Sequence, residues 1–217
     1  MNEKNLLILK GGSWHDGDGF TDEMTALLTP HGWSVLSTYD MDQLLRLEEN
    51  KIDLIVSYTC FSANPDLENQ KGAGYLTDAQ VDALAEWVRA GGKFLPAHAA
   101  TAAGKSKALY SELIGGKFVE HPPQFSFTVS PMYAPHPITE GIEAFTVLDE
   151  FYIETYSPEV NVHMVALDRG VAHPMVWSKT EGKGRVAHIA PGHGPNVWQM
   201  PQYQQLMLNT IGWLMEG

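Results

Sequence analysis

Residues 77–98 read TDAQVDALAEWVRAGGKFLPAH, and this stretch contains a helix, a stop and a buried strand in that order. Thr77 is placed to cap the helix, and Gln80 three residues later completes a capping box. Apolar residues then recur at helical spacing until two glycines end the helix, and a strand begins at residues 93–96. A helix that leads directly into a buried strand is the repeating unit of a doubly wound sheet, so the stretch predicts an α/β fold.

The same alternation of strand and helix fills the first half of the chain. Strands are predicted at residues 6–9, 33–38 and 52–58, and helices at residues 21–28 and 41–47. The second half changes to strands of mixed direction and a closing helix. Strands are predicted at residues 124–130, 145–148, 164–167, 175–178 and 184–190, with a hairpin turn at residues 180–184 and a helix at residues 201–214. No repeat or linker interrupts the pattern, so we expect residues 1–217 to form a single domain.

The charge and composition of the chain limit the classes of partner and the cellular location that we expect for it. The formal net charge is −12, and no basic patch offsets it, so we expect no nucleic-acid partner. The apolar run at residues 6–9 is too short for a signal-peptide core, and no other run approaches the roughly 20 residues that span a bilayer. We therefore expect no membrane association and a cytoplasmic location. Cys60 is the single cysteine, which excludes an internal disulfide and a zinc–thiolate cluster. Self-association as a homo-oligomer is compatible with this composition.

Polar and aromatic side chains follow the predicted strands, where the carboxyl ends of parallel strands form ligand sites. They are Trp14 and His15, His98, His121, Asp149 and Glu150 with Tyr152, and His193 with Trp198. His98 and His193 follow apolar strands beside small residues, so they are the first candidates for proton transfer or metal ligation. Histidines from separate segments would hold a divalent ion such as zinc or manganese, and we expect His98, His121 and His193 to be its ligands.

Each of these residues also has a simpler interpretation. A loop histidine commonly donates its ring N–H to a backbone carbonyl, and aromatic residues commonly fill the core. Asp149 and Glu150 are candidates for acid and base, but neighbours on a strand point to opposite faces, so one of the two is expected to reach a pocket. Trp14, Tyr152 and Trp198 are candidates for stacking on a sugar ring, with His15 beside them as a further substrate-binding residue.

A nucleotide cofactor is not expected. Gly11 and Gly12 precede Ser13 in a turn that exposes backbone N–H groups, but the stretch has neither the Gly-x-Gly-x-x-Gly spacing nor the lysine of a phosphate-binding loop.

Several segments in consistent order resemble the ThuA-like (trehalose utilisation) family. They are residues 91–100 (GGKFLPAHAA), 110–122 (YSELIGGKFVEHP), 136–142 (HPITEGI), 145–152 (FTVLDEFY), 182–186 (GKGRV) and 192–193 (GH). The resemblance implies a flavodoxin-like sandwich of the class I glutamine amidotransferase type, with a largely parallel central sheet and additional antiparallel strands in the C-terminal half. Pro96 stands where the family usually has glycine, which puts the shape of that turn in doubt.

The resemblance also separates this chain from the amidotransferases themselves. Their cysteine nucleophile occupies a strand-to-helix turn, and the matching turn here carries His98, while Cys60 follows an earlier strand. Glutamine hydrolysis through a thioester needs a thiolate at that turn, so we do not expect it.

The family is linked to the use of trehalose and related disaccharides, alongside a partner sugar dehydrogenase that forms 3-keto sugars. The resemblance therefore implies an enzyme, a lyase, isomerase or hydrolase, that acts on a small-molecule sugar or its 3-keto derivative. His98 and His193 with Glu150 or Asp149 would carry the reaction, with or without a metal ion. The alternative is a non-catalytic sugar-binding or regulatory protein on the same scaffold, because fold alone does not fix a reaction.

Overall fold

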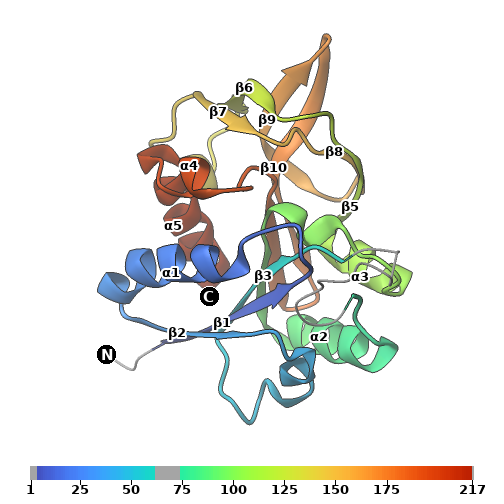
Figure 1. The fold of residues 1–217 in the computed structure, drawn as a ribbon. Coiled ribbons are helices and arrows are strands. Elements are labelled where there is room, and N and C mark those ends of the chain that lie inside the picture. The colour runs from blue at the N-terminus through green and yellow to red at the C-terminus, as the bar shows by residue number, and fades with distance from the viewer. Residues whose placement is uncertain (1–3, 62–73, 217) are drawn as a thin grey trace.

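A nine-stranded sheet with helices on both faces forms the centre of the protein in the computed structural model, which describes residues 4–61 and 74–216 (Figure 1). The strand order is β2-β1-β3-β4-β11-β10-β9-β6-β7. The strands are β1 (Lys4–Gly11), β2 (Trp33–Thr38), β3 (Leu54–Thr59), β4 (Lys93–Pro96), β6 (Phe125–Pro131), β7 (Phe145–Asp149), β9 (Asn161–Asp168), β10 (Val171–Glu181) and β11 (Gly184–Ile189). A second, two-stranded sheet pairs β5 (Gly116–Glu120) with β8 (Ile153–Tyr156).

The N-terminal half of the large sheet is parallel and the C-terminal half is antiparallel. β2, β1, β3, β4 and β11 run parallel to one another, and β11, β10, β9, β6 and β7 pair antiparallel. The predicted hairpin turn joins β10 to β11, where Glu181 pairs with Gly184. The expected fold class, an α/β sandwich with a largely parallel sheet and added antiparallel strands, is confirmed.

Two separate cores lie on the two faces of the sheet. The helices are α1 (Gly17–Leu28), α2 (Asp78–Ala90), α3 (Ala108–Ile114), α4 (Pro195–Trp198) and α5 (Pro201–Met215). Helices α1 and α5 pack against one face, with Leu6 and Ile8 of β1 in their core. Helices α2 and α3 pack against the other face, with Leu7 and Leu9 in that core. β1 is therefore apolar on both sides, as a buried parallel strand should be.

Local chemistry explains where the helices begin and end. The predicted capping box is present at α2, where the Thr77 side chain accepts from the Gln80 backbone N–H and the Gln80 side chain accepts from the Thr77 N–H. Residues 41–47, expected as a short helix, form a 3-10 helix at Met41–Arg46, in which the Asp40 carboxylate accepts from the N–H of Asp42. Further 3-10 turns occur at Thr29–His31, His98–Thr101 and Pro137–Thr139.

Three elements beside the cavities described below, α3, β5 and β8, were not anticipated from the sequence, and neither was the four-residue helix α4. Helix α3 is only seven residues long, and Gly115 ends it in a left-handed conformation with φ 81°. β5 and β8 have one largely exposed face, so their apolar residues do not form the continuous runs that mark the buried strands. Helix α3 and strands β5 and β8 frame these cavities.

One buried histidine that lines neither of those cavities, His163, should make the fold sensitive to acid. His163 on β9 places its Nε2 2.7 Å from Ser178 Oγ on β10, and its ring stacks on His136. Burial, together with repulsion from His136, lowers the pKa of His163 to about 4. The unfolded chain, with an ordinary histidine pKa, therefore binds more protons than the folded chain between about pH 6.5 and 4. The contribution of neutral His163 to the free energy of unfolding is fully present above this pH window and is lost as the pH falls through it.

We expect the His163→Gln variant to lose less stability than the wild type between pH 7 and pH 4.5, because glutamine does not titrate. The difference at pH 4.5 should be about 2 kcal/mol, measured as the change in unfolding free energy from denaturant titrations at each pH. His31→Gln, at an exposed position, is the matched control and should follow the wild-type curve. Parallel curves for the wild type and His163→Gln would contradict the assignment.

Candidate metal centre

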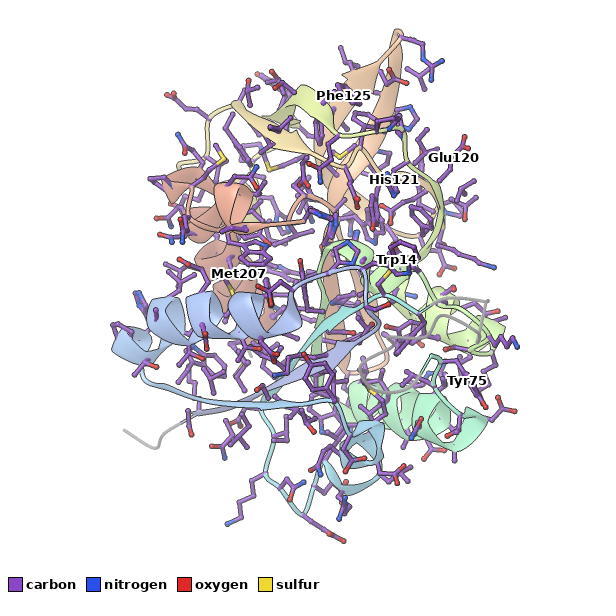
Figure 2. The ribbon with its side chains drawn as sticks, viewed as in Figure 1. Trp14, Tyr75, Glu120, His121, Phe125 and Met207 are labelled. Carbon is purple, nitrogen blue, oxygen red and sulfur yellow. The ribbon has the colours of Figure 1, made fainter. Side chains whose placement is uncertain are left out.

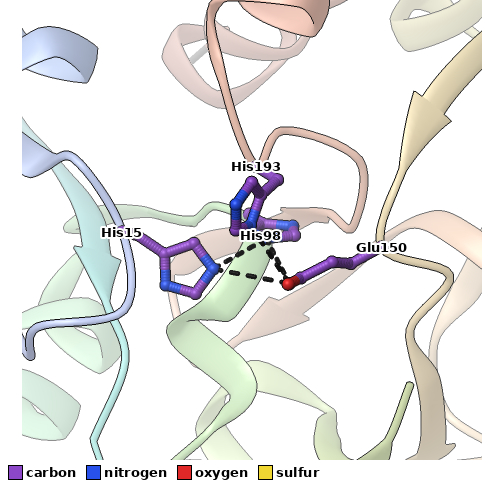
Figure 3. A group of neighbouring side chains, drawn as sticks. All are labelled: His15, His98, Glu150 and His193. Atoms are coloured by element: carbon purple, nitrogen blue, oxygen red, sulfur yellow. Dashed lines mark hydrogen bonds and ion pairs between the residues drawn. The ribbon is translucent and has the colours of Figure 1, made fainter. Parts of the chain in front are cut away.

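Four segments that follow sheet strands bring three histidines and a glutamate together. His15 lies in the loop after β1, His98 begins the turn after β4, Glu150 directly follows β7 and His193 lies in the loop after β11. We call these four residues the histidine–glutamate group. Their side chains point toward one another from different sides (Figure 3). One ligand atom from each lies within 4.8 Å of the other three.

The closest of these atoms are separated by nearly equal distances. Glu150 Oε2 lies 3.5 Å from His15 Nε2, 3.4 Å from His98 Nε2 and 3.2 Å from His193 Nδ1. The two Nε2 atoms of His15 and His98 are 3.1 Å apart. Among the described residues, Glu150 Oε2 and His193 Nδ1 are buried without a hydrogen-bond partner. Buried polar atoms normally have partners, so two unpartnered atoms that face a common point form a candidate cation site.

The orientation of His98 is fixed by the backbone. Its Nδ1 lies 2.7 Å from the Ala190 carbonyl oxygen, so this nitrogen carries the proton and donates it to that oxygen. The lone pair of Nε2 is thereby directed into the group, the arrangement that metal-ligating histidines commonly show. His98 is fully buried and has φ 47°, a left-handed conformation that costs a non-glycine residue about 1 kcal/mol or more.

The electrostatics of the group favour an ionised Glu150 and a neutral His15. Burial alone would raise the pKa of Glu150, but the three facing imidazoles outweigh it and hold the pKa well below its usual range. Burial lowers the pKa of His15 to about 4, so its ring is neutral near pH 7. The facing carboxylate of Glu150 raises the pKa of His193. The group thus contains an ionised carboxylate and a neutral buried imidazole, both of which are competent ligands.

Asp149 and Glu150 point in different directions. The side chain of Asp149 is fully buried, and its carboxylate accepts the backbone N–H groups of Glu150, Gly192 and His193 at 2.8, 2.7 and 3.2 Å. Asp149 therefore anchors the loop that carries His193, while Glu150 faces the group. Gly192 has φ 142°, and a Cβ atom there would lie 2.9 Å from the Tyr203 hydroxyl, so this loop requires glycine.

A cavity of about 650 Å³, here called the site cavity, opens from the group. His15, Glu150 and His193 line it together with Trp14, His121 and Tyr152. Figure 2 shows Trp14 and His121 in the same part of the molecule. Trp14 is 59 % exposed, whereas Tyr152 is buried. The indole face is therefore available to a ligand.

His121 and Trp198, both candidates from the sequence, lie outside the group. His121 Nε2 is 3.7 Å from Glu150 Oε1, the oxygen turned away from the other histidines, and its ring stacks on Tyr152. His15 takes the place in the group that the sequence suggested for His121. Trp198 is buried in the core beside α1, and its indole N–H donates to the Gly192 carbonyl oxygen. The indole of Trp198 therefore has no free face for a sugar and supports the His193 loop instead.

Several wall residues had not been proposed as site residues from the sequence. They are Cys60, Phe61, Ala102, Ala103, Gly104, Lys117 and Phe118. Lys117 and Phe118 belong to β5, whose position next to the group follows from pairing with β8 and has no local sequence signal. Burial raises the pKa of the Cys60 thiol to about 12, so it is not a reactive thiolate near neutral pH.

The fold and the site define an α/β sandwich protein with a histidine–carboxylate centre at the carboxyl ends of its strands. The model of the ThuA family, described as trehalose utilisation, matches residues 5–214, and the chain belongs to this family. No curated protein matches the sequence.

Solved structures with the same fold span nearly the whole chain. A ThuA-like protein from Parabacteroides merdae has a TM-score of 0.77 at 16 % identity and covers 98 % of this chain and 90 % of its own. A ThuA-like protein from Bacteroides uniformis has a TM-score of 0.74 at 18 % identity, covering 97 % and 91 %. A protein from Salmonella typhimurium described as cytoplasmic has a TM-score of 0.64 at 14 % identity, covering 97 % and 98 %. At these identities the likeness shows the fold alone.

Within residues 4–61 and 74–216, no helix has the length and apolar character needed to cross a membrane.

Proposed function

We propose that this protein is a metal-assisted enzyme that acts on a disaccharide of the trehalose type or on its 3-keto derivative. The observation that carries the proposal is the convergence of three imidazole nitrogens and one carboxylate oxygen at the floor of a cavity with an exposed indole in its wall. Family membership supports a role in sugar use, and the choice of substrate and reaction is our inference.

The group fits a divalent ion of the zinc or manganese type. For metal–ligand bonds of about 2.0–2.1 Å, the ligands of a tetrahedral ion are separated by about 3.3 Å. Four of the six pairwise separations, from 3.1 to 3.5 Å, bracket that value, and the other two lie within 4.8 Å, so binding of an ion would draw these atoms closer together. Three nitrogens and one oxygen are donors that zinc commonly takes, and manganese also accepts them. His15, His98, Glu150 and His193 would hold the ion, and a substrate oxygen would bind it as an additional ligand.

The cavity residues have separate roles in this proposal. The exposed face of Trp14 is available to the C–H face of a sugar ring. A bound ion would polarise the keto oxygen of the sugar and so acidify the neighbouring C–H bond. His121 donates its Nδ1–H to the Pro122 carbonyl oxygen at 2.9 Å, which leaves the Nε2 lone pair free to accept that proton. Loss of the proton would lead to isomerisation or to departure of the glycosidic oxygen from the adjacent carbon.

The proposal also implies a partner and a location. A keto sugar must be supplied by an enzyme that oxidises a sugar hydroxyl, so a sugar dehydrogenase would act before this protein. A cytoplasmic location is also part of the proposal, and its support is the structural neighbour from Salmonella typhimurium that is described as a cytoplasmic protein.

A non-catalytic sugar-binding protein is the second candidate, and the exposed Trp14 beside the cavity is the observation that favours it. The two candidates differ in turnover. A binder would hold trehalose or its 3-keto form without changing it, whereas the enzyme would consume the 3-keto form and release glucose or an isomer.

The first test is elemental analysis of the purified protein together with the His193→Ala variant. We expect close to one zinc or manganese ion per wild-type chain and almost none in the variant, because a ligand nitrogen is lost. The metal-free wild type and the variant should melt within about 2 °C of each other, since the side chain of His193 is 31 % exposed and removes little packing. His31→Ala is the control and should retain the ion. Wild-type protein that is purified without any bound metal, or a fall of many degrees in the melting temperature of the variant, would argue for a structural histidine.

A further inference from the structure

A second, larger cavity adjoins the site cavity. It measures about 800 Å³ and lies between α3, the β5–β8 sheet and the end of β10. We call it the α3 cavity. Ala103, Gly104 and Lys117 line both cavities, so the two adjoin at these three residues, and we call the pair of cavities the trough. The histidine–glutamate group lies in one half of this trough, and none of its members lines the other half.

The two halves of the trough differ in chemistry. Around the site cavity the walls are largely aromatic, with Trp14, Phe61 and Phe118 among them. Around the α3 cavity the walls carry the hydroxyls of Ser111, Thr155 and Ser157 and the side chains of charged residues. Such walls offer donors and acceptors to a ligand rich in hydroxyls, while the aromatic half suits the apolar face of a ring.

The α3 cavity is lined by equal numbers of basic and acidic side chains. Three basic residues, Arg89, Lys117 and Lys179, face three acidic ones, Glu112, Glu159 and Glu181.

Two of the cations are already held by protein groups. Lys179 Nζ donates to the Glu112 carbonyl oxygen at 3.0 Å and pairs with Glu181 at 2.9 Å, and Arg89 pairs with the same carboxylate at 2.8 Å. A cavity with no net charge and two of its three cations engaged favours a neutral polar ligand over a phosphate or another anion.

We propose that the α3 cavity is the subsite for the second unit of the substrate, a neutral unit rich in hydroxyls, while the reacting ring lies against Trp14 at the histidine–glutamate group. The inference rests on the proposed function. It assigns an orientation to the substrate, in which the bond between the two units lies beside the residues that line both cavities. Lys117, which is exposed at that position on β5, contacts this bond or the second unit. A substrate of two units would fill both halves, and a single sugar would fill only the site cavity.

The test compares two probes, trehalose and methyl α-D-glucoside, titrated calorimetrically into the full-length protein. We expect trehalose to bind at least 10-fold more tightly than the glucoside, because only trehalose reaches both cavities. Thr155→Trp should reduce trehalose affinity to that of the glucoside and leave glucoside affinity unchanged, since the indole occupies the α3 cavity. Thr155 is an exposed strand residue that accepts a large side chain. Ser157→Trp, in the loop after β8, should act in the same way.

The control is Thr146→Trp, an exposed position on β7 that lines neither cavity, and it should leave both affinities unchanged. Equal wild-type affinity for the two probes would overturn the subsite while leaving the metal centre in place, and so would tryptophan variants that keep the preference for trehalose. Failure of both probes to bind the wild type would overturn the subsite and the sugar specificity of the proposed function together. Metal content, measured in parallel, reports on the centre independently.

Discussion

The His98→Asn variant should bind zinc or manganese more than about 100-fold more weakly than the wild type and should lose turnover of a 3-keto disaccharide to a similar extent. His98 is the member of the group whose ligand nitrogen is fixed most completely. It is fully buried, its Nδ1–H is held by the Ala190 carbonyl oxygen, and its Nε2 lies within 3.4 Å of two other members of the group. Asparagine is shorter and cannot place a ligand atom at the position of Nε2.

Asparagine is the replacement of choice because the backbone at this position is left-handed, with φ 47°. Asparagine adopts this conformation more readily than most residues, so the turn after β4 should survive the change. The measurement is a competition titration of the metal-free protein with a chromophoric chelator, together with circular dichroism to check the fold.

The matched comparison is His121→Asn. His121 lines the same cavity but lies outside the group, so this variant should keep the ion with wild-type affinity and lose turnover only. Loss of the ion from both variants to the same extent would place His121 among the ligands. Retention of the ion by His98→Asn would remove the metal centre from the proposal.

The Asp149→Asn variant should lower metal affinity by about 10- to 100-fold without removing any ligand. The buried carboxylate of Asp149 accepts three backbone N–H groups, two of them from the loop that carries His193. The amide has the same shape, but its NH₂ group would face a backbone N–H, donor against donor. One or more of these bonds would therefore be lost, at a cost of about 1–3 kcal/mol in unfolding free energy.

The lost hydrogen bonds should lower metal affinity because they hold His193 in position. When the loop is no longer held against β7, the Nδ1 atom of His193 departs from its place 3.2 Å from Glu150 Oε2. We expect lower metal affinity and a lower melting temperature together, measured by the chelator titration and by thermal unfolding of the metal-free protein. Addition of excess zinc should restore part of the melting temperature, because the ion binds the folded state.

The control for this change is Asp53→Asn. Asp53 accepts one backbone N–H, from Asn5, at an exposed site remote from the group, so stability should change little and metal affinity should stay at the wild-type value. Unaltered metal binding in Asp149→Asn would show that the loop holds its position without the carboxylate.

The sequence predicts that the residues of the histidine–glutamate group lie at strand ends, but it does not predict which of these residues reach the group. Polar residues at strand ends were recognisable because strands β1, β4 and β11 are apolar runs followed by small or polar residues. These loops do meet in space. The choice of His15 over His121 as the fourth member of the group depends on how far each loop extends and on the direction of its side chain, which no spacing in the sequence encodes.

The amino-acid sequence by itself determined the alternation of strands and helices, the helix cap at Thr77, the hairpin between β10 and β11 and the family. The family rests on the resemblance of several segments along the chain. The other features depend on local periodicity, capping and turn chemistry, which act between residues close together in the chain. The tertiary structure alone decided that Glu150 turns inward while Asp149 holds a loop, that the ligand atoms lie a few ångströms apart, and that β5 and β8 close a second cavity. Such outcomes depend on strand order, register and burial across more than 100 residues of chain, because a shift of one residue in a strand reverses the face of every side chain on it.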